Sequence, residues 1–118
     1  MDKFIIEGGV PLKGTVEVSG SKNALLPILA ATLLTSDKCV IKNAPDLRDT
    51  TSMLKILRYL GSNFDFRNHT IIIKPNGVAK IEAPYKLVST MRASFCVLGP
   101  LLSRYRKAKV SLPGGCVI

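Results

Sequence analysis

The succession of apolar patterns between residues 21 and 74 constrains the fold of this chain more than any other feature, because helical and strand spacing alternate along it. Residues 21–34 are apolar on nearly every face of a helix, which is typical of a helix enclosed by other elements. Pro27 should kink this helix or set its first turn. Residues 38–42 then have the composition of a strand.

A second helix and a β-hairpin complete this unit. Asp49 can cap a helix that carries Leu and Met at core spacing and stops at Gly61. Residues 64–66 and 70–74 are expected to pair as two strands around a turn at residues 68–69. The resulting αβαββ order predicts an α/β domain assembled from repeated helix and strand units.

Weaker signals flank the unit on both sides. Residues 4–6 and 15–18 are strand-like and separated by a Gly-Gly-Val-Pro turn, so a hairpin-like start is expected. After residue 80 a strand, a helix opened by Pro84 and a strand at residues 110–111 begin to repeat the first unit. An apolar stripe should continue through this helix, interrupted at residues 99–100. Its members are Leu87, Met91, Phe95, Leu98 and Leu102.

Composition excludes several classes of protein. Hydrophobic residues make up 47% and charged residues 21% of the 118 residues, which is typical of a globular chain and not of a disordered one. The longest nearly apolar run, residues 24–34, is shorter than the roughly 18 residues that a membrane span needs, and no secretion signal precedes it. Three cysteines without C-x-x-C spacing and a single histidine, His69, argue against a zinc site or a disulfide framework. We therefore expect a cytoplasmic protein.

The net charge of +9 raises the possibility of a basic module that binds nucleic acid. The basic residues are spread along the chain, however, and the one dense patch, residues 104–107 with Lys109, lies where a helix should lead into a strand. A solvated turn is the favoured interpretation of this patch, because runs of charge usually face water. Nucleic-acid binding is therefore the weaker hypothesis.

Lys22 is the first residue whose position suggests chemistry. A cation in the opening turn of a helix opposes the helix dipole, so local stability does not explain it. A bound anion would, because the backbone N–H groups of a helix start and an ammonium together form a phosphate or carboxylate site, and Asn23 adds a donor and an acceptor. The alternative, which spacing alone favours, is a lysine that points into solvent behind a serine cap.

Arg92 is expected on an apolar helix face, one turn from Val88, Phe95 and Cys96. A guanidinium buried there would need an acidic side chain or an anionic ligand. With eight acidic residues in the chain, a ligand is a reasonable partner. The alternative is that the side chain reaches the surface along its own methylene groups.

Cys116 has a stronger indication of function than the other two cysteines. It follows residues 113–115, Pro-Gly-Gly, where the backbone is unshielded and can approach a ligand closely. A thiol is mostly protonated at neutral pH, so it can donate a proton as well as act as a nucleophile. Cys39 and Cys96 are interpreted as packing residues. A free surface thiol in a loop remains the alternative for Cys116.

Three separated segments together resemble the enolpyruvyl transferase family. They are residues 19–24 (Ser-Gly-Ser-Lys-Asn-Ala), residues 91–101 with Met-Arg-Ala-Ser and Leu-Gly-Pro-Leu, and residues 111–116 (Ser-Leu-Pro-Gly-Gly-Cys). The resemblance implies two domains of repeated βαβαββ units, an inside-out α/β barrel of which this chain holds only part. It also implies that residues 1–20 belong to the domain completed by the C-terminal half of the enzyme. Residues 21–118 would begin the other domain and break off after the cysteine loop.

The resemblance implies transfer of the enolpyruvyl group of phosphoenolpyruvate to the 3′-hydroxyl of UDP-N-acetylglucosamine, the first committed step of peptidoglycan synthesis. Lys22 and Asn23 would hold phosphoenolpyruvate, Arg92 would contact the sugar nucleotide, and Cys116 would donate a proton to the methylene carbon. No metal or organic cofactor is implied. The family's later arginines and its acidic general base have no counterpart here, so the chain alone should lack turnover and should need the missing C-terminal part. A 5-enolpyruvylshikimate-3-phosphate synthase is the rival enzyme, and it lacks the Pro-Gly-Gly-Cys loop.

Overall fold

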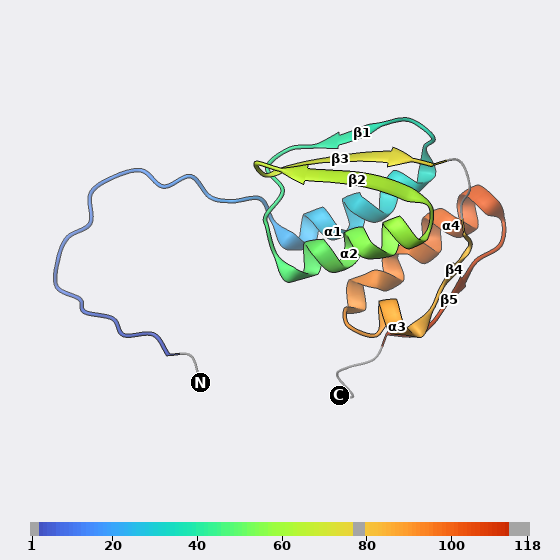
Figure 1. The fold of residues 1–118 in the computed structure, drawn as a ribbon. Helices are drawn as coiled ribbons and strands as arrows, with labels where there is room; N and C mark the ends of the chain where they lie inside the picture. The colour runs from blue at the N-terminus through green and yellow to red at the C-terminus, as the bar shows by residue number, and fades with distance from the viewer. Residues whose placement is uncertain (1–2, 77–79, 114–118) are drawn as a thin grey trace.

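The computed structural model describes residues 3–76 and 80–113, which form one α/β domain preceded by an extended arm (Figure 1). A three-stranded sheet lies over one side of two helices, and a second, two-stranded sheet lies at the far end of the domain. In chain order the elements are α1 (Lys22–Ala31), η1 (Thr32–Leu34), β1 (Cys39–Ile41), α2 (Arg48–Tyr59), β2 (Ser62–Arg67), β3 (Thr70–Pro75), β4 (Glu82–Ala83), α3 (Tyr85–Val88), η2 (Arg92–Val97), α4 (Leu98–Tyr105) and β5 (Lys109–Val110), where η marks a 3₁₀ helix.

Helix α1 forms where the apolar run predicts it. Its N-cap is Ser21, whose hydroxyl oxygen accepts a hydrogen bond from the backbone N–H of Ala24 at 3.4 Å. The helix continues through Pro27, which has no N–H to donate to the carbonyl of Asn23 one turn earlier. The prediction of a helix enclosed on nearly every face is wrong, because Ile28 is 48% exposed and only one side of α1 is buried.

Helix α2 and the hairpin confirm the predicted end of the αβαββ unit. Gly61 has a φ of 110°, a left-handed conformation that glycine adopts without strain, and it ends the helix as expected. Strands β2 and β3 pair in antiparallel register around Asn68 and His69, which both have positive φ. Strand β1 pairs with the other edge of β3, so the strand order is β1-β3-β2. The helix begins at Arg48, however, with Leu47 as the N-cap, so the prediction that Asp49 caps it is wrong.

The hydrophobic core surrounds the paired helices α1 and α2, with the three-stranded sheet on one side and α3, η2 and α4 on the other. Helix α1 packs against α2 on one side and against η2 on the other, while α2 packs against β2. The largest side chains that are fully buried come from α1, α2, β3 and the segment after residue 80, and they include Leu29, Met53, Leu57, Ile73 and Leu101. Both helices are therefore held at fixed positions beneath the sheet.

The segment after residue 80 folds as a βαβ unit, in which β4 and β5 pair in parallel across α3, η2 and α4. Pro84 is the N-cap of α3, as predicted. The expected interruption of the apolar stripe at residues 99–100 is wrong, because the break lies between α3 and η2. The helix breaks at extended Met91, and the buried Ser94 hydroxyl lies 2.9 Å from the carbonyl of Val88. Pro100 falls in the first turn of α4, where a missing N–H costs no helical hydrogen bond.

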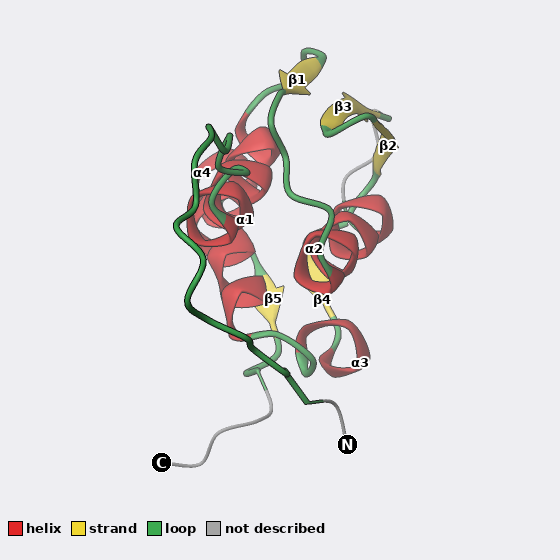
Figure 2. Ribbon diagram, turned by 90° about the vertical axis from the view of Figure 1, so that its left-hand side faces the viewer, coloured by secondary structure: helices red, strands yellow, loops and turns green. Residues whose placement is uncertain are grey.

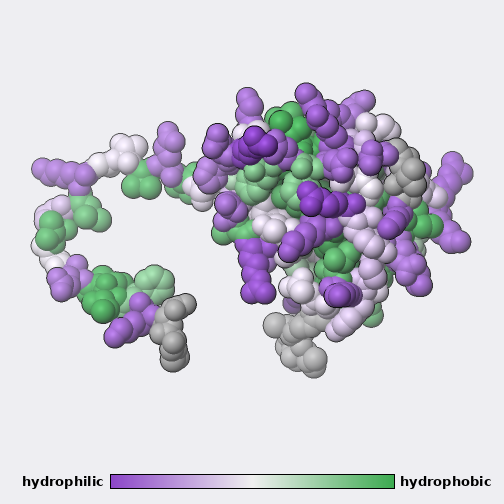
Figure 3. Space-filling view, in the orientation of Figure 1, coloured by the Kyte–Doolittle hydropathy of each residue, from purple (hydrophilic) through white to green (hydrophobic). Residues whose placement is uncertain are grey.

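Residues 3–20 form no strand, so the predicted hairpin at residues 4–6 and 15–18 is wrong for this chain. They extend away from the domain (Figure 1), and their apolar side chains are exposed and do not pack against it (Figure 3). Phe4 and Leu12 are 97% and 96% exposed. An isolated pair of short strands is at best marginally stable in water, and no other strand of the described chain lies beside it. Assignment of residues 1–20 to a second domain stays a prediction.

Candidate functional site

Lys22 is the first residue of α1, and its ammonium lies against the first turn of α2. The distance from Lys22 Nζ to Asp49 Oδ2 is 3.0 Å. The Lys22 side chain is 47% exposed and that of Asp49 33% exposed, so the pair is partly shielded and still open to solvent on one side. The lysine therefore neither points freely into solvent nor lacks an anionic partner, and that partner comes from a second helix.

The N-terminal ends of α1 and α2 lie on the same side of the domain (Figure 2). The first four N–H groups of a helix have no partner within the helix, and the helix dipole places partial positive charge there. Two such ends beside one ammonium favour negative charge at this side of the molecule. Of the two first turns, only that of α2 contains an acidic residue, which is Asp49.

Asn23 shares the first turn of α1 with Lys22, and both side chains are exposed. Its amide can donate and accept hydrogen bonds. Its backbone carbonyl is also available, because Pro27 provides no N–H at the position that would normally pair with it. Lys22 and Asn23 thus present a cation, a donor and two acceptors at one helix start.

Arg92 is the first residue of η2, and it is exposed. The expectation that it shares an apolar helix face with Val88 and Phe95 is wrong, because the chain is extended at Met91, with φ −156° and ψ 123°. No carboxylate in residues 3–76 or 80–113 forms an ion pair with it. Helix η2 packs directly against α1, so the guanidinium belongs to an element adjoining that of Lys22.

Of the two cysteines expected to be packing residues, only Cys39 is partly buried. Cys116 lies outside the described residues, so its approach to Lys22 and Arg92 stays a prediction. Cys39 is half-buried in β1, in agreement with a packing role. Cys96 is exposed, so its assignment as a packing residue is wrong. The 3₁₀ geometry of η2 turns its side chain outward, whereas a continuous helix would have placed it on the apolar stripe.

Sequence reasoning missed the contact that holds the chain just before Lys22. Gly20 lies so close to the Asn43 carbonyl that a Cβ built on Gly20 would stand 1.9 Å from that oxygen. Asn43 itself has a φ of 55°. A side chain at residue 20 would therefore push apart two backbone segments, one of which leads into α1. The glycine between two serines is the only signal of this contact in the sequence.

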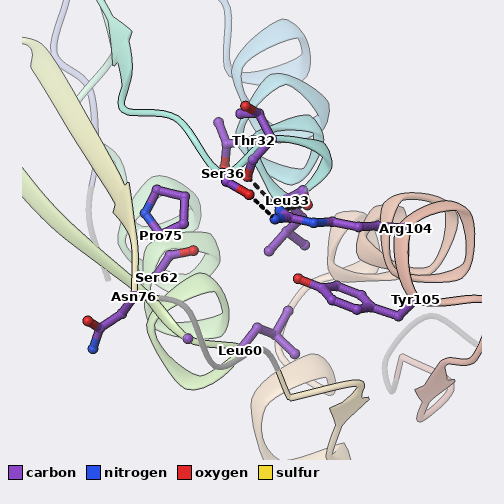
Figure 4. A pocket seen from close by; sticks show the side chains of 11 residues that line it. Thr32, Leu33, Ser36, Leu60, Ser62, Pro75, Asn76, Arg104 and Tyr105 are labelled. Atoms are coloured by element: carbon purple, nitrogen blue, oxygen red, sulfur yellow. Dashed lines mark hydrogen bonds between the residues drawn. The ribbon is translucent and has the colours of Figure 1, made fainter.

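A small pocket lies elsewhere on the domain, where the ends of α1 and α2 meet α4 (Figure 4). The Arg104 guanidinium donates to the carbonyls of Leu33 at 2.8 Å and Thr35 at 2.6 Å, and to the Ser36 hydroxyl. The expectation of a solvated turn is therefore wrong at Arg104, which closes the C-terminal end of the α1–η1 helix. The pocket has a volume of about 190 Å³, and Lys22 is not among its lining residues.

No group of three or more His, Cys, Asp or Glu side chains in the described part of the chain could hold a metal ion. Across the same residues, no helix combines the length and the apolar character that spanning a membrane requires.

A family model described as EPSP synthase (3-phosphoshikimate 1-carboxyvinyltransferase) matches residues 6–118 of the chain. This chain belongs to the EPSP synthase family. Proteins similar to it include the UDP-N-acetylglucosamine 1-carboxyvinyltransferases of Methylacidiphilum infernorum, 55% identical, and Lawsonia intracellularis, 56% identical. Each alignment covers 100% of this chain and 28% of the relative, so the chain spans just over a quarter of their length.

A solved structure supports the same assignment. The chain resembles the enolpyruvyl transferase NikO from Streptomyces tendae with a TM-score of 0.70 and 30% sequence identity, over 82% of this chain and 23% of that one. The expected fold class is thus confirmed: the α/β domain is part of the enolpyruvyl transferase fold of the EPSP synthase family. The family resemblance carried by three short motifs is confirmed as well, whereas the roles of Lys22, Asn23, Arg92 and Cys116 stay predictions.

Proposed function

We propose that this chain forms part of an enzyme that transfers the enolpyruvyl group of phosphoenolpyruvate to the 3′-hydroxyl of UDP-N-acetylglucosamine and releases phosphate. The observation that carries the proposal is 52–56% identity over the whole chain to relatives named UDP-N-acetylglucosamine 1-carboxyvinyltransferase. In this role the enzyme performs the first committed step of peptidoglycan synthesis, in the cytoplasm, where phosphoenolpyruvate is made.

Lys22 and Asn23 bind phosphoenolpyruvate in this proposal. The substrate carries a carboxylate and a phosphate, and both are acceptors for an ammonium and for the N–H groups at a helix start. The start of α1 offers the Lys22 ammonium and the Asn23 amide, and the start of α2 adds further positive potential beside them. As the phosphate leaves, the same cation stabilises the charge that develops on it.

Arg92 and Cys116 complete the proposed chemistry. Arg92, which is exposed and has no acidic partner among the described residues, contacts the sugar nucleotide, whose diphosphate suits a guanidinium. The Cys116 thiol gives its proton to the methylene carbon while the 3′-oxygen of the sugar adds to the neighbouring carbon and loses its own proton to a general base in the rest of the enzyme. Loss of phosphate and of a methyl proton then regenerates the double bond. The thiol can also add across the double bond, with sulfur bonding to the phosphate-bearing carbon and the proton going to the methylene carbon, which leaves a phospholactoyl group on Cys116.

A chimeric enzyme tests the proposal, because the chain covers only 28% of its relatives. Residues 1–118 are joined to the part of the Methylacidiphilum infernorum relative that lies beyond the alignment, and phosphate release is followed. We expect release that depends on both phosphoenolpyruvate and UDP-N-acetylglucosamine and that falls at least ~100-fold in Cys116→Ala. The isolated chain should show no turnover. A chimera without activity, beside an active parent enzyme, would contradict the proposal.

The family model favours one alternative acceptor, shikimate 3-phosphate, because its description names EPSP synthase. The proposed phosphoenolpyruvate site is common to both reactions, so the acceptor decides between them. The same chimera is therefore assayed with each acceptor. Activity with shikimate 3-phosphate and none with UDP-N-acetylglucosamine would replace the proposed reaction with the alternative.

A further inference from the structure

The ion pair between Lys22 and Asp49 differs from the other ion pairs in the described residues. It joins the first turns of two separate helices, and its acidic member is 33% exposed. Asp65 pairs with Arg67 two residues away on the same strand, and its side chain is 54% exposed. The third pair, between β4 and β5, is also well exposed on both sides. Of the three, the first alone fixes a functional side chain of one helix to another.

Within the described residues, the Lys22 ammonium is the one polar side-chain partner recorded for Asp49. The N-cap is Leu47, no side chain caps the helix, and within the described residues the Asp49 carboxylate makes no hydrogen bond to a free backbone N–H. A carboxylate in a first turn is stabilised by the helix dipole, which keeps it charged and in place. An exposed ion pair contributes little to stability, so the gain from this contact lies in where it holds the Lys22 ammonium.

We infer that Asp49 is a positioning residue for Lys22 in the proposed transfer of the enolpyruvyl group. An ammonium has three N–H donors on a flexible stem of four carbons. Asp49 takes one donor at 3.0 Å, which restrains the stem, and the 47% exposed side chain leaves the other donors open toward phosphoenolpyruvate. This inference rests on the proposed function, because it assumes that Lys22 binds that substrate.

The inference predicts an effect confined to one substrate. Without Asp49 the ammonium samples more rotamers, and the misplaced cation stabilises the leaving phosphate less well. In the chimera, we expect Asp49→Ala to lower kcat/KM for phosphoenolpyruvate about 30-fold, while KM for UDP-N-acetylglucosamine changes less than about 2-fold. Asp49→Glu, which keeps the charge, should recover part of the loss.

Asp65→Asn is the matched control, because it removes an ion pair of the same 3.0 Å length whose two members both lie on strand β2. It should leave both kinetic constants unchanged. Binding of phosphoenolpyruvate to the 118-residue chain, followed by backbone amide shifts in the first turn of α1, gives a readout that does not need turnover. Asp49→Ala should weaken that binding about 5-fold or more, and Asp65→Asn should not.

The outcomes separate the two claims. An active parent chimera in which Asp49→Ala retains parental constants overturns the role of Asp49 and leaves the proposed function intact. Equal loss for both substrates, with no recovery in Asp49→Glu, also overturns it, because a general structural defect would then explain the result. A parent that neither turns over nor binds phosphoenolpyruvate overturns the proposed function and this inference with it.

Discussion

Gly20→Ala tests most directly how the chain is held before the first turn of α1. The added carbon would stand 1.9 Å from the Asn43 carbonyl oxygen, 3.2 Å from the carbonyl carbon and 3.3 Å from Pro45 Cδ. Ordinary contact begins near 3.4 Å, so the oxygen and the new methyl group must separate by roughly 1.5 Å. The neighbour is backbone and cannot rotate away, which means that a whole segment has to move.

The cost of this movement follows from overpacking, which typically destabilises by about 1–3 kcal/mol. We expect Gly20→Ala to lower the free energy of unfolding by about 2 kcal/mol, or Tm by about 8 °C in a domain near this size. The assay is thermal and urea unfolding of the 118-residue chain, followed by circular dichroism. The conformation of Gly20 is not the cause, because its φ lies outside the left-handed region.

Gly99→Ala is the matched control. Gly99 lies in α4, and beyond its chain neighbours and its own helix backbone no described atom lies within 4 Å of the position that an added methyl group would take. Alanine also favours a helix, so the free energy of unfolding should rise by about 0.5 kcal/mol. Equal stability of the two alanine variants would refute the argument, since both add the same methyl group and differ only in what that group meets.

Three further predictions concern the core, the α4 contact and the thiols. Leu57→Ala should lower the free energy of unfolding by about 2–5 kcal/mol because Leu57 is fully buried, whereas Leu112→Ala, at a 75% exposed residue, should change it by less than about 0.5 kcal/mol in the same urea experiment. Arg104→Ala should cost about 1.5–3 kcal/mol through the loss of its bonds to two carbonyls, and a lysine there should restore only part of it, as thermal unfolding would reveal. Iodoacetamide should label exposed Cys96 several-fold faster than half-buried Cys39, and mass spectrometry of peptides at early times would contradict this by giving the reverse order.

The αβαββ unit can be predicted because its signals are local. Gly61 and the turn at Asn68 and His69 require left-handed backbone, and the residue types at these positions tolerate it. Apolar spacing places α2 and the strands within a residue or two of their observed bounds. Each of these features depends on neighbours in the sequence more than on the rest of the fold.

The region from Pro84 to Arg104 cannot be predicted in this way because tertiary contacts decide it. The Ser94 hydroxyl is buried beside the Val88 carbonyl and stabilises a break that spacing alone does not require. Arg104 belongs to a basic run typical of a solvated turn, yet it reaches the end of the α1–η1 helix. Val88 lies 6 residues from Ser94 in the sequence, and Leu33 lies 71 residues from Arg104. Neither separation matches the three or four residues that bring side chains together on a helix.

The candidate site divides along the same line. The sequence places Lys22 and Asn23 correctly at a helix start, since Ser21 signals the cap and the apolar run signals the helix. The contact with Asp49 cannot be foreseen, because it depends on how α1 and α2 pack. The position of Asp49 in the sequence predicts that it caps the second helix, whereas in the structure its carboxylate forms an ion pair with the Lys22 ammonium.

The arm at residues 3–20 has a consequence for how this polypeptide acquires order. No residue from 3 to 19 takes part in a hydrogen bond with the described remainder, and the arm's large apolar side chains lie open to water. The arm therefore adds nothing to the cooperativity of unfolding, and its amides should exchange with solvent deuterium as fast as those of a short peptide. If another surface binds this arm, the contacts formed there must offset the whole conformational entropy that the arm loses on becoming ordered.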